Sequence, residues 1–188
     1  MPFLAGILKG KSLRIRSCGD EDGEKVLAIV NRAAEAYRGH IPDDCWHDPY
    51  MPRAEYEAEL ARGARFIGAE ADGALVGVMA AEEVRNVELI RHAYVLPDCQ
   101  GHGIGTALLA ELRARAGRQV MVGTWAGATW AIAFYERHGF VRLPPAVEPL
   151  VLRTYWAVPP RQLEVSVALA SPALDEEQAR ALVAEATG

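Results

Sequence analysis

The chain has 188 residues, of which 51% are hydrophobic and 24% are charged, and its formal net charge at pH 7 is −5. This length suits one domain, and the composition is that of an ordinary globular protein that can bury a sizeable core. The net negative charge argues against nucleic acid or an anionic membrane as the main partner, because both are themselves negatively charged.

The cysteines and the apolar segments bear on where the protein works. Cys18, Cys45 and Cys99 are odd in number and far apart, and they form no CxxC pair. This pattern predicts reduced thiols, with no disulfide framework and no metal site. The start, MPFLAGILKGK, places its positive charges after a short apolar stretch, which is the reverse of a signal peptide. No apolar run approaches the roughly 20 residues that span a bilayer. We therefore expect a cytoplasmic protein without a membrane segment.

The N-terminal third is predicted to form a strand, a helix, a loop and a second helix, over 12–18, 19–39, 40–52 and 53–63. The strand alternates polar and apolar residues, whereas the first helix repeats its apolar residues at helical spacing. Asp20 or Asp22 is expected to cap that helix at its start. Gly39 and Gly63 are expected to end the two helices.

The middle of the chain predicts a hairpin followed by a third strand. The segments 64–70 and 75–82 flank Ala71-Asp72-Gly73, a turn signal typical of antiparallel hairpins. The next strand is predicted over 87–95. Pro97 ends it, because proline has no N–H group to donate to a neighbouring strand.

Helices and strands alternate in the last part of the chain. We expect helices over 106–117 and 126–139, strands over 118–125, 140–143 and 163–170, a helical turn over 150–156, and a short helix in the tail that begins at Ser171. Together these elements predict a mixed α+β fold, with mostly antiparallel strands and two helical crossovers late in the chain.

Three glycines at alternate positions, Gly101, Gly103 and Gly105, lie where the strand over 87–95 gives way to a helix. Such a turn can bind a phosphate, because the first N–H groups of a helix have no partner within the helix and the helix dipole points its positive end at them. A Rossmann fingerprint is excluded, since its third glycine would fall at Thr106, and a Walker loop would need a lysine that is not there. The remaining alternative is a tight turn with no ligand.

The residues around these glycines resemble a known family. The segment AYVLPDCQGHGIGTALL contains the pattern Q-x-x-G-x-G at Gln100, Gly103 and Gly105, and WAIAFYERHGF follows further along the chain. This pair of motifs, in this order, resembles the GCN5-related N-acetyltransferase (GNAT) superfamily. The second motif matches the family at Ala131, Phe134, Tyr135, Gly139 and Phe140. The resemblance covers 12–170, which defines an acetyltransferase domain with an extension at 1–11 and a tail at 171–188.

The resemblance implies a V-shaped, mostly antiparallel sheet whose two central strands run parallel and splay apart. It also implies that acetyl-CoA is bound in that splay, between 87–95 and 118–125. The pantetheine arm is expected to pair with Ala93, Tyr94 and Val95 like an added strand, and the amide near Val95 to hold the acetyl carbonyl. The pyrophosphate is expected to lie over the turn formed by Gln100, Gly101, His102, Gly103, Ile104, Gly105 and Thr106.

Tyr135 occupies the position of the family's usual acid, near the sulfur of the leaving thiol. Proton transfer from a tyrosine with a pKa of ~10 to a thiolate whose thiol has a pKa of ~8.5 costs about 2 kcal/mol. Tyr135 therefore either has a lowered pKa or donates a hydrogen bond without full proton transfer. The alternative is an aromatic side chain that only anchors its helix on the sheet. Ala128 stands where many members carry Asn, which puts one contact to the cofactor arm in doubt.

The general base is not fixed by the sequence. Deprotonation of a lysine-like amine costs about 4 kcal/mol at pH 7, because only about one molecule in 10³ is neutral. Deprotonation of an α-amino group costs only about 1 kcal/mol. We assign Glu83 and His92 as the candidate catalytic residues beside Tyr135. The strand pattern does not say which side chains point inward, and His92 could equally be a packed sheet residue. Further candidates are Glu82, Glu88, His47 and Asp48.

The segment from Ile41 to Leu60 carries six acidic residues against one basic residue, Arg53. In the family, the segment that joins the first two helices usually covers the acceptor site. Asp44, Trp46 and His47 are therefore predicted to bind the substrate, and an acidic, aromatic cover would suit a small cationic amine. Glu55, Glu57 and Glu59 are expected to lie on a solvated helix face.

The predicted function is that of an acetyl-CoA-dependent N-acetyltransferase, which transfers an acetyl group directly to a primary amine of a small molecule. Two alternatives stay open. One is acetylation of peptide or protein N-termini, and the other is a non-catalytic acyl-CoA-binding sensor. The insert over 143–162 would either fold over the acceptor side or make the contact of a homodimer.

Overall fold

The computed structural model describes residues 13–188, and the predicted extension at 1–11 lies outside them. The described chain forms a seven-stranded sheet in the order β1-β2-β3-β4-β5-β7-β6. The pair β4–β5 runs parallel, whereas β1–β2, β2–β3, β5–β7 and β6–β7 are antiparallel. The predicted mixed α+β fold with two parallel strands inside a mostly antiparallel sheet is confirmed. The strands are β1 (Leu13–Ser17), β2 (Arg65–Ala71), β3 (Ala74–Val84), β4 (Val87–Val95), β5 (Gln119–Trp125), β6 (Val141–Arg142) and β7 (Ser166–Ser171).

Seven α-helices accompany the sheet, and none of those in the described part of the chain has the length and hydropathy that crossing a bilayer requires. The α-helices are α1 (Gly23–Ala34), α2 (Arg53–Ala61), α3 (Ile104–Arg115), α4 (Thr129–Arg137), α5 (Glu148–Tyr155), α6 (Pro160–Glu164) and α7 (Glu176–Thr187). Short 3₁₀ turns lie at η1 (Asp20–Asp22), η2 (Glu35–Tyr37), η3 (Asp43–Cys45) and η4 (Pro97–Cys99).

The chain divides into two compact units. The first consists, within the described residues, of 13–36, 47–82 and 91–115, and the second of 37–46, 83–90 and 116–188. Strand β4 passes from the second unit into the first after Ile90.

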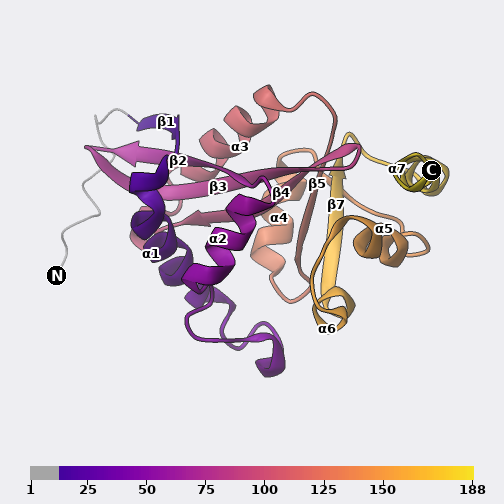
Figure 1. Cartoon of the computed structure of the whole chain (residues 1–188), viewed down its shortest axis with the longest axis horizontal. Helices are drawn as coiled ribbons and strands as arrows, with labels where there is room; N and C mark the ends of the chain where they lie inside the picture. Colours follow the sequence, from indigo (N-terminus) through magenta and orange to yellow (C-terminus); the bar gives the residue numbers. More distant parts are fainter. Residues whose placement is uncertain (1–12) are drawn as a thin grey trace. The chain divides into compact units, whose positions relative to one another are not determined.

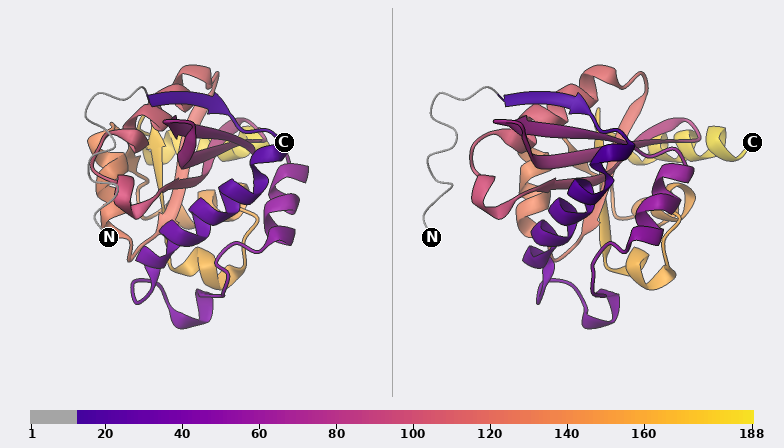
Figure 2. Two further views of the ribbon diagram at one scale, coloured as in Figure 1. Left: turned by 90° about the vertical axis from the view of Figure 1, so that its left-hand side faces the viewer. Right: turned by 60° about the vertical axis from the view of Figure 1, so that its left-hand side comes forward.

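In the first unit, two helices cover one face of the strands. The apolar residues of α1 and Tyr56 of α2 pack against Phe66 on β2 and against Val78 and Ala80 on β3. Helix α3 contacts β1 and β2, and it lies on the opposite face from α1 in Figure 1 and in both views of Figure 2. The hairpin between β2 and β3 turns at Asp72 (φ 52°) and Gly73 (φ 78°). Two consecutive positive φ angles are what a tight hairpin of this kind requires, so the predicted turn is confirmed.

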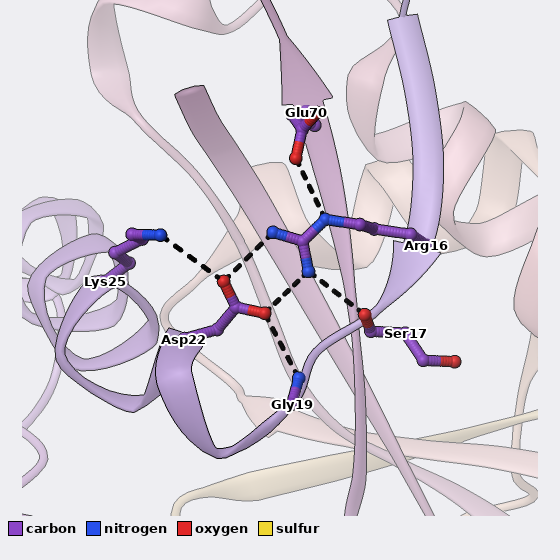
Figure 3. Close-up of polar contacts among 6 residues, drawn as sticks. All are labelled: Arg16, Ser17, Gly19, Asp22, Lys25 and Glu70. Carbon is purple, nitrogen blue, oxygen red and sulfur yellow. Dashed lines mark hydrogen bonds and ion pairs between the residues drawn. The ribbon is translucent and has the colours of Figure 1, made fainter. Parts of the chain in front are cut away.

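A partly buried ion pair joins β1 to the start of α1 (Figure 3). The guanidinium of Arg16 donates to both carboxylate oxygens of Asp22, over 2.5 and 2.9 Å, and its Nε donates to Glu70 over 2.9 Å. The sequence predicted Asp20 or Asp22 as the cap of this helix. Asp22 is the residue that precedes α1, but its carboxylate accepts from the amide of Gly19 and from Arg16 rather than from a helical N–H group.

In the second unit, α5 and α7 pack together on the sheet, and Figure 1 shows both on the same side of β7. Val151, Tyr155 and Val183 lie in their shared core. The hydroxyl of Tyr155 donates to the side-chain oxygen of Asn86 over 2.8 Å, and the amide nitrogen of Asn86 donates to the carbonyl of Leu182 over 2.9 Å. The C-terminal helix is therefore held both by apolar packing and by hydrogen bonds.

Several predicted boundaries were wrong, and the helix predicted over 19–39 is α1, Gly23–Ala34. Helix α3 begins at Ile104, two residues before the predicted start at 106, because Gly103 already turns the chain into the helix. The predicted turn over 150–156 belongs to the full helix α5. The predicted strand over 163–170 begins only at Ser166, because Pro160 starts the short helix α6 that takes up the preceding residues. Proline favours the first position of a helix, and the strand pattern by itself gave no sign of this helix.

Candidate active site

The parallel ladder between the central strands stops halfway along β4. Its register runs from Val87 opposite Gln119 to Ile90 opposite Val122. Strand β4 continues to Val95, and its burial changes at the same point: Val87–Ile90 are buried, whereas the residues from Arg91 onward are half-buried. The predicted positions Ala93, Tyr94 and Val95 lie in this second half, where β4 is no longer paired with β5.

The second half of β4 leads directly into the glycine turn of the first unit. Leu96 donates its amide to the carbonyl of Val76 over 2.9 Å, and the side chain of Gln100 donates to the carbonyl of Val95 over 3.1 Å. These two bonds fix the end of the strand against its neighbour and against the turn. Gln100 thus holds the turn in place through its side chain, a role that the sequence did not predict.

Gly101 and Gly103 give the turn its shape. Their φ angles are +78° and +79°, a region that favours glycine. A methyl group placed on either residue would meet no atom within 4 Å, and both residues are exposed. Helix α3 begins at Ile104, and Ala107 donates its amide to the carbonyl of Gly103 over 2.9 Å. The helix dipole and the first helical N–H groups therefore face an uncovered turn, which fits an anionic ligand such as a pyrophosphate.

One supporting glycine was missed at the sequence level. A Cβ on Gly77 of β3 would lie 3.1 Å from a methyl carbon of Ile104 and 3.2 Å from the carbonyl oxygen of Tyr94. Only a residue without a side chain lets α3 and β4 come this close to β3. A glycine inside a strand pattern indicates such a close approach, so the segment LVGV already indicated this contact.

His92, a candidate base, lies on β4 in the first unit beside Glu59, whose predicted exposure was wrong. Glu59 of α2 was expected on a solvated helix face, but only 3% of its surface is exposed. Its Oε2 lies 3.6 Å from Nε2 of His92, and its Oε1 accepts from Arg62 and Arg91. Burial raises the pKa of Glu59, but the contacts with His92 and Arg91 outweigh that effect and lower the pKa to about 2. Glu59 is therefore ionised at neutral pH.

The other carboxylates of this region differ in surroundings. The side chain of Glu83 is 51% exposed and lies 3.5 Å from Arg118 in the second unit. Glu82 is buried and lies 3.4 Å from Arg91 in the first unit. Glu88 is buried on the second-unit half of β4. Among residues 13–188, no group of three or more His, Cys, Asp or Glu side chains is arranged to hold a metal ion.

Tyr135 lies on α4 in the second unit, and only 4% of its surface is exposed. Its ring contacts Phe134 and Phe140 at centroid distances of 5.2 and 5.4 Å. Burial, together with the nearby Tyr37, raises the pKa of Tyr135 well above its ordinary value. The predicted alternative of a lowered pKa is therefore wrong, whereas a phenol that donates a hydrogen bond without full proton transfer and an aromatic that only anchors its helix both fit this burial. Ala128, the position where many relatives carry Asn, is fully buried just before α4.

The predicted substrate residues are divided between the two units. Asp44 and Trp46 belong to the second unit: Asp44 accepts from Arg161 over 2.8 Å, and the guanidinium of Arg38 lies 4.2 Å from the ring of Trp46. The hydrogen bond from Arg161 lowers the pKa of Asp44, whose charge is balanced by this partner. His47 belongs to the first unit, where it lies 3.5 Å from Glu55 and stacks on Tyr50.

Comparison with known proteins agrees with this geometry. Residues 62–142 match the sequence model of the acetyltransferase (GNAT) domain. The fold is similar to that of the PaiA N-acetyltransferase from Thermoplasma acidophilum, solved in complex with coenzyme A, at 18% identity and a TM-score of 0.64, over 85% of this chain and 98% of that one. It is also similar to a ribosomal-protein-alanine N-acetyltransferase from Brucella melitensis, at 28% identity and a TM-score of 0.54, over 69% of this chain and 85% of that one.

A third similar structure is a GNAT family acetyltransferase from Brucella melitensis in complex with acetyl-CoA, at 23% identity and a TM-score of 0.53, over 69% of this chain and 83% of that one. The two sequence motifs, the order of the strands and the matched domain agree with one another. On these grounds residues 62–142 match a GNAT acetyltransferase domain, and the fold of the described chain is similar to that of acetyltransferases of this kind.

Proposed function

We propose that this protein transfers an acetyl group from acetyl-CoA directly to a primary amine of a small molecule. One observation carries the proposal. Strand β4 continues past the end of its parallel ladder and runs into an uncovered glycine turn at the start of α3. An extended segment followed by helical amides offers hydrogen bonds first to an amide-containing arm and then to a diphosphate.

The residues that would hold acetyl-CoA all belong to the first unit. The backbone of Gln100–Thr106 would bind the pyrophosphate, and Ala93, Tyr94 and Val95 would pair with the pantetheine arm. Two of the similar structures were solved with coenzyme A or acetyl-CoA. When bound, acetyl-CoA supplies a thioester whose carbonyl carbon accepts the amine.

Tyr135 is the proposed donor to the leaving sulfur. Because its pKa is raised, the phenol keeps its proton, so it would stabilise the departing thiolate by a hydrogen bond rather than by full transfer. The proposed bases are His92 and Glu83. His92 is favoured, because it is held beside a buried carboxylate, whereas Glu83 is half exposed to solvent next to Arg118.

The acceptor is proposed to be a small amine that meets Asp44, Trp46 and His47. Acetylation of a peptide N-terminus is a second candidate, because one similar structure is a ribosomal-protein-alanine N-acetyltransferase. A thiol-release assay over amino acids, polyamines, aminoglycosides and peptides separates the two. Release of coenzyme A with small amines alone supports the first candidate. Release with peptides alone would support the second.

The variant Tyr135→Phe tests catalysis itself. We expect it to bind acetyl-CoA as the wild type does in calorimetry and to lose 10²- to 10⁴-fold in turnover, as is typical when a proton donor is removed. Tyr155→Phe is the matched control, since Tyr155 is also a buried tyrosine of the second unit but donates to Asn86. We expect that control to keep its turnover. Binding of coenzyme A without thiol release from any amine would instead identify a non-catalytic sensor.

A further inference from the structure

The carboxylate of Glu59 divides its two oxygens between different partners. Its Oε1 accepts from Arg62 over 2.6 Å and from Arg91 over 3.0 Å. Its Oε2 has no hydrogen-bond partner among the described residues, and it faces Nε2 of His92 at 3.6 Å. One oxygen is thus satisfied by guanidinium groups, and the other is directed at the imidazole.

The imidazole of His92 is held in a fixed plane. It stacks against Phe66 at 5.7 Å with an interplanar angle of 10°, and against Tyr94 at 6.4 Å with an angle of 24°. Its Nε2 is buried and lacks a hydrogen-bond partner within residues 13–188, yet 12% of the side chain is exposed. The exposed surface of the side chain therefore does not include Nε2.

The charged groups around Glu59 and His92 decide which ring nitrogen of His92 carries the proton. Glu59 lies on α2 and Arg62 directly follows that helix. Arg91 lies on β4, and Glu82 of β3 is 3.4 Å from it. Because Glu59 is ionised, its Oε2 can only accept a hydrogen bond. A buried carboxylate oxygen without a donor is costly, and the Nε2–H of His92, whose nitrogen lies 3.6 Å away, can supply one.

We propose that Glu59 is a positioning residue, which holds His92 with its proton on Nε2 so that Nδ1 acts as the general base for an alkylamine acceptor. This inference rests on the proposed function and narrows its substrate class. A base built in this way matters most for an amine that is cationic at neutral pH, because an alkylamine has a pKa of about 10.4 and an α-amino group one of about 8. The structure thus favours an alkylamine over a peptide N-terminus.

The proton balance of the step is complete. The acceptor ammonium gives one proton to Nδ1 of His92, and its nitrogen then forms the C–N bond to the acetyl carbon as the C–S bond breaks. The second proton of the amine ends on the sulfur, which yields coenzyme A. His92 passes its proton to solvent, and Nε2 keeps its hydrogen throughout, directed at Glu59.

The tautomer can be observed without any substrate. In long-range ¹H–¹⁵N correlation spectra of the protein labelled with ¹⁵N-histidine, His92 is assigned by its loss in His92→Gln. We expect a protonated Nε2 and an unprotonated Nδ1 in the wild type, and a loss of this preference in Glu59→Gln. A wild-type His92 with its proton on Nδ1 overturns the proposal, whether or not the protein is an enzyme.

The substrate class is tested with 2-phenylethylamine, an alkylamine, and alaninamide, an α-amine. We expect Glu59→Gln to lower kcat for 2-phenylethylamine by 10²-fold or more, and kcat for alaninamide by less than 10-fold, with an unchanged KM for acetyl-CoA. Glu57→Gln is the matched control, because Glu57 lies on the exposed side of the same helix beside Arg53. It should leave both rates unchanged.

Each other outcome counts against the inference. Equal losses with both amines would mean that Glu59 is structural, and wild-type activity with alaninamide alone would overturn the alkylamine assignment. Activity with neither amine would also overturn the alkylamine assignment, even if the NMR spectrum shows the expected tautomer. The proposed function would then be tested separately, by binding of coenzyme A. Thermal melting shows whether Glu59→Gln is folded. If it is not, Glu59→Asp, which keeps the charge, should retain the tautomer and more than a tenth of the alkylamine rate.

Discussion

Asp22 keeps its negative charge in a fully buried place because Arg16 binds both of its carboxylate oxygens (Figure 3). The hydrogen bonds from Arg16 lower the pKa of Asp22 well below its ordinary range, even though burial acts in the opposite direction. Nζ of Lys25 lies 3.6 Å from Oδ1 of Asp22 and adds a further positive charge. The pair ties the edge strand β1 to the start of α1, so its effect is on stability.

The pH dependence of this stabilisation follows from the direction of the shift. A carboxyl group whose pKa is depressed by folding stabilises the fold fully above its unfolded pKa of about 3.9 and loses this effect as the pH falls below that value. We expect Asp22→Asn to lower the free energy of unfolding by about 2 kcal/mol at pH 7, because Arg16 then loses its buried carboxylate partner and keeps Glu70 and the carbonyl of Ser17.

Urea denaturation followed by tryptophan fluorescence checks this prediction. The difference between wild type and Asp22→Asn should shrink steadily between about pH 4 and pH 2. Asp20→Asn, in an exposed position of the same turn, serves as the control and should change little. A difference that stays constant down to pH 2 would show that the charge of Asp22 is not what stabilises the fold.

At the scale of elements, the glycine turn combines positive φ angles with an exposed surface. Gly101 and Gly103 adopt positive φ angles without any neighbour that restricts their volume. Their role is therefore conformational, together with access to the amides at the start of α3. Gly77 differs, because neighbouring atoms already lie at the distance of a tight contact from its Cβ position.

We expect Gly103→Ala to weaken coenzyme A binding by 10-fold or more and to cost about 1–2 kcal/mol of stability, because an L-residue is strained at this positive φ. Calorimetric titration and thermal melting measure the two effects. Gly117→Ala is the matched control, since Gly117 follows the other end of α3 and has open space around its Cβ position. If both variants bind coenzyme A equally well, the turn is not the phosphate site.

At the scale of the whole molecule, each compact unit has an apolar core among residues 13–188. One core lies between α1, α2 and the strands β2 and β3, and the other between α5, α7 and the strands of the second unit. The C-terminal helix belongs to the second core through Ala179 and Val183, and its last turn accepts a hydrogen bond from Arg85 through the carbonyl of Ala186.

Val183→Asp should therefore destabilise the protein by about 3 kcal/mol or more, because it places an unpaired carboxylate in an apolar core. The control is Ala181→Asp, which adds the same charge to the exposed side of α7. Chemical denaturation of both variants gives the comparison. Equal stability of the two variants would mean that α7 does not seal the second core.

The sequence by itself determined what depends on local preferences. The hairpin at Asp72-Gly73, the glycine turn at Gly101–Gly105 and the type of nearly every element followed from residues close together in the chain. The backbone angles that glycine permits and the spacing of apolar residues act over a few positions, so they can be read without knowing the fold. The two acetyltransferase motifs are local patterns of the same kind.

Only the tertiary structure decided which distant residues meet. Glu59 looked like one acid among several on a helix, and it became a partner of His92 only because α2 packs against β4. Likewise, Asp44 is paired with Arg161, a residue more than a hundred positions away, and the pKa of Tyr135 is raised by its burial. Electrostatic pairing and desolvation depend on distances across the fold, and local sequence patterns do not encode these distances.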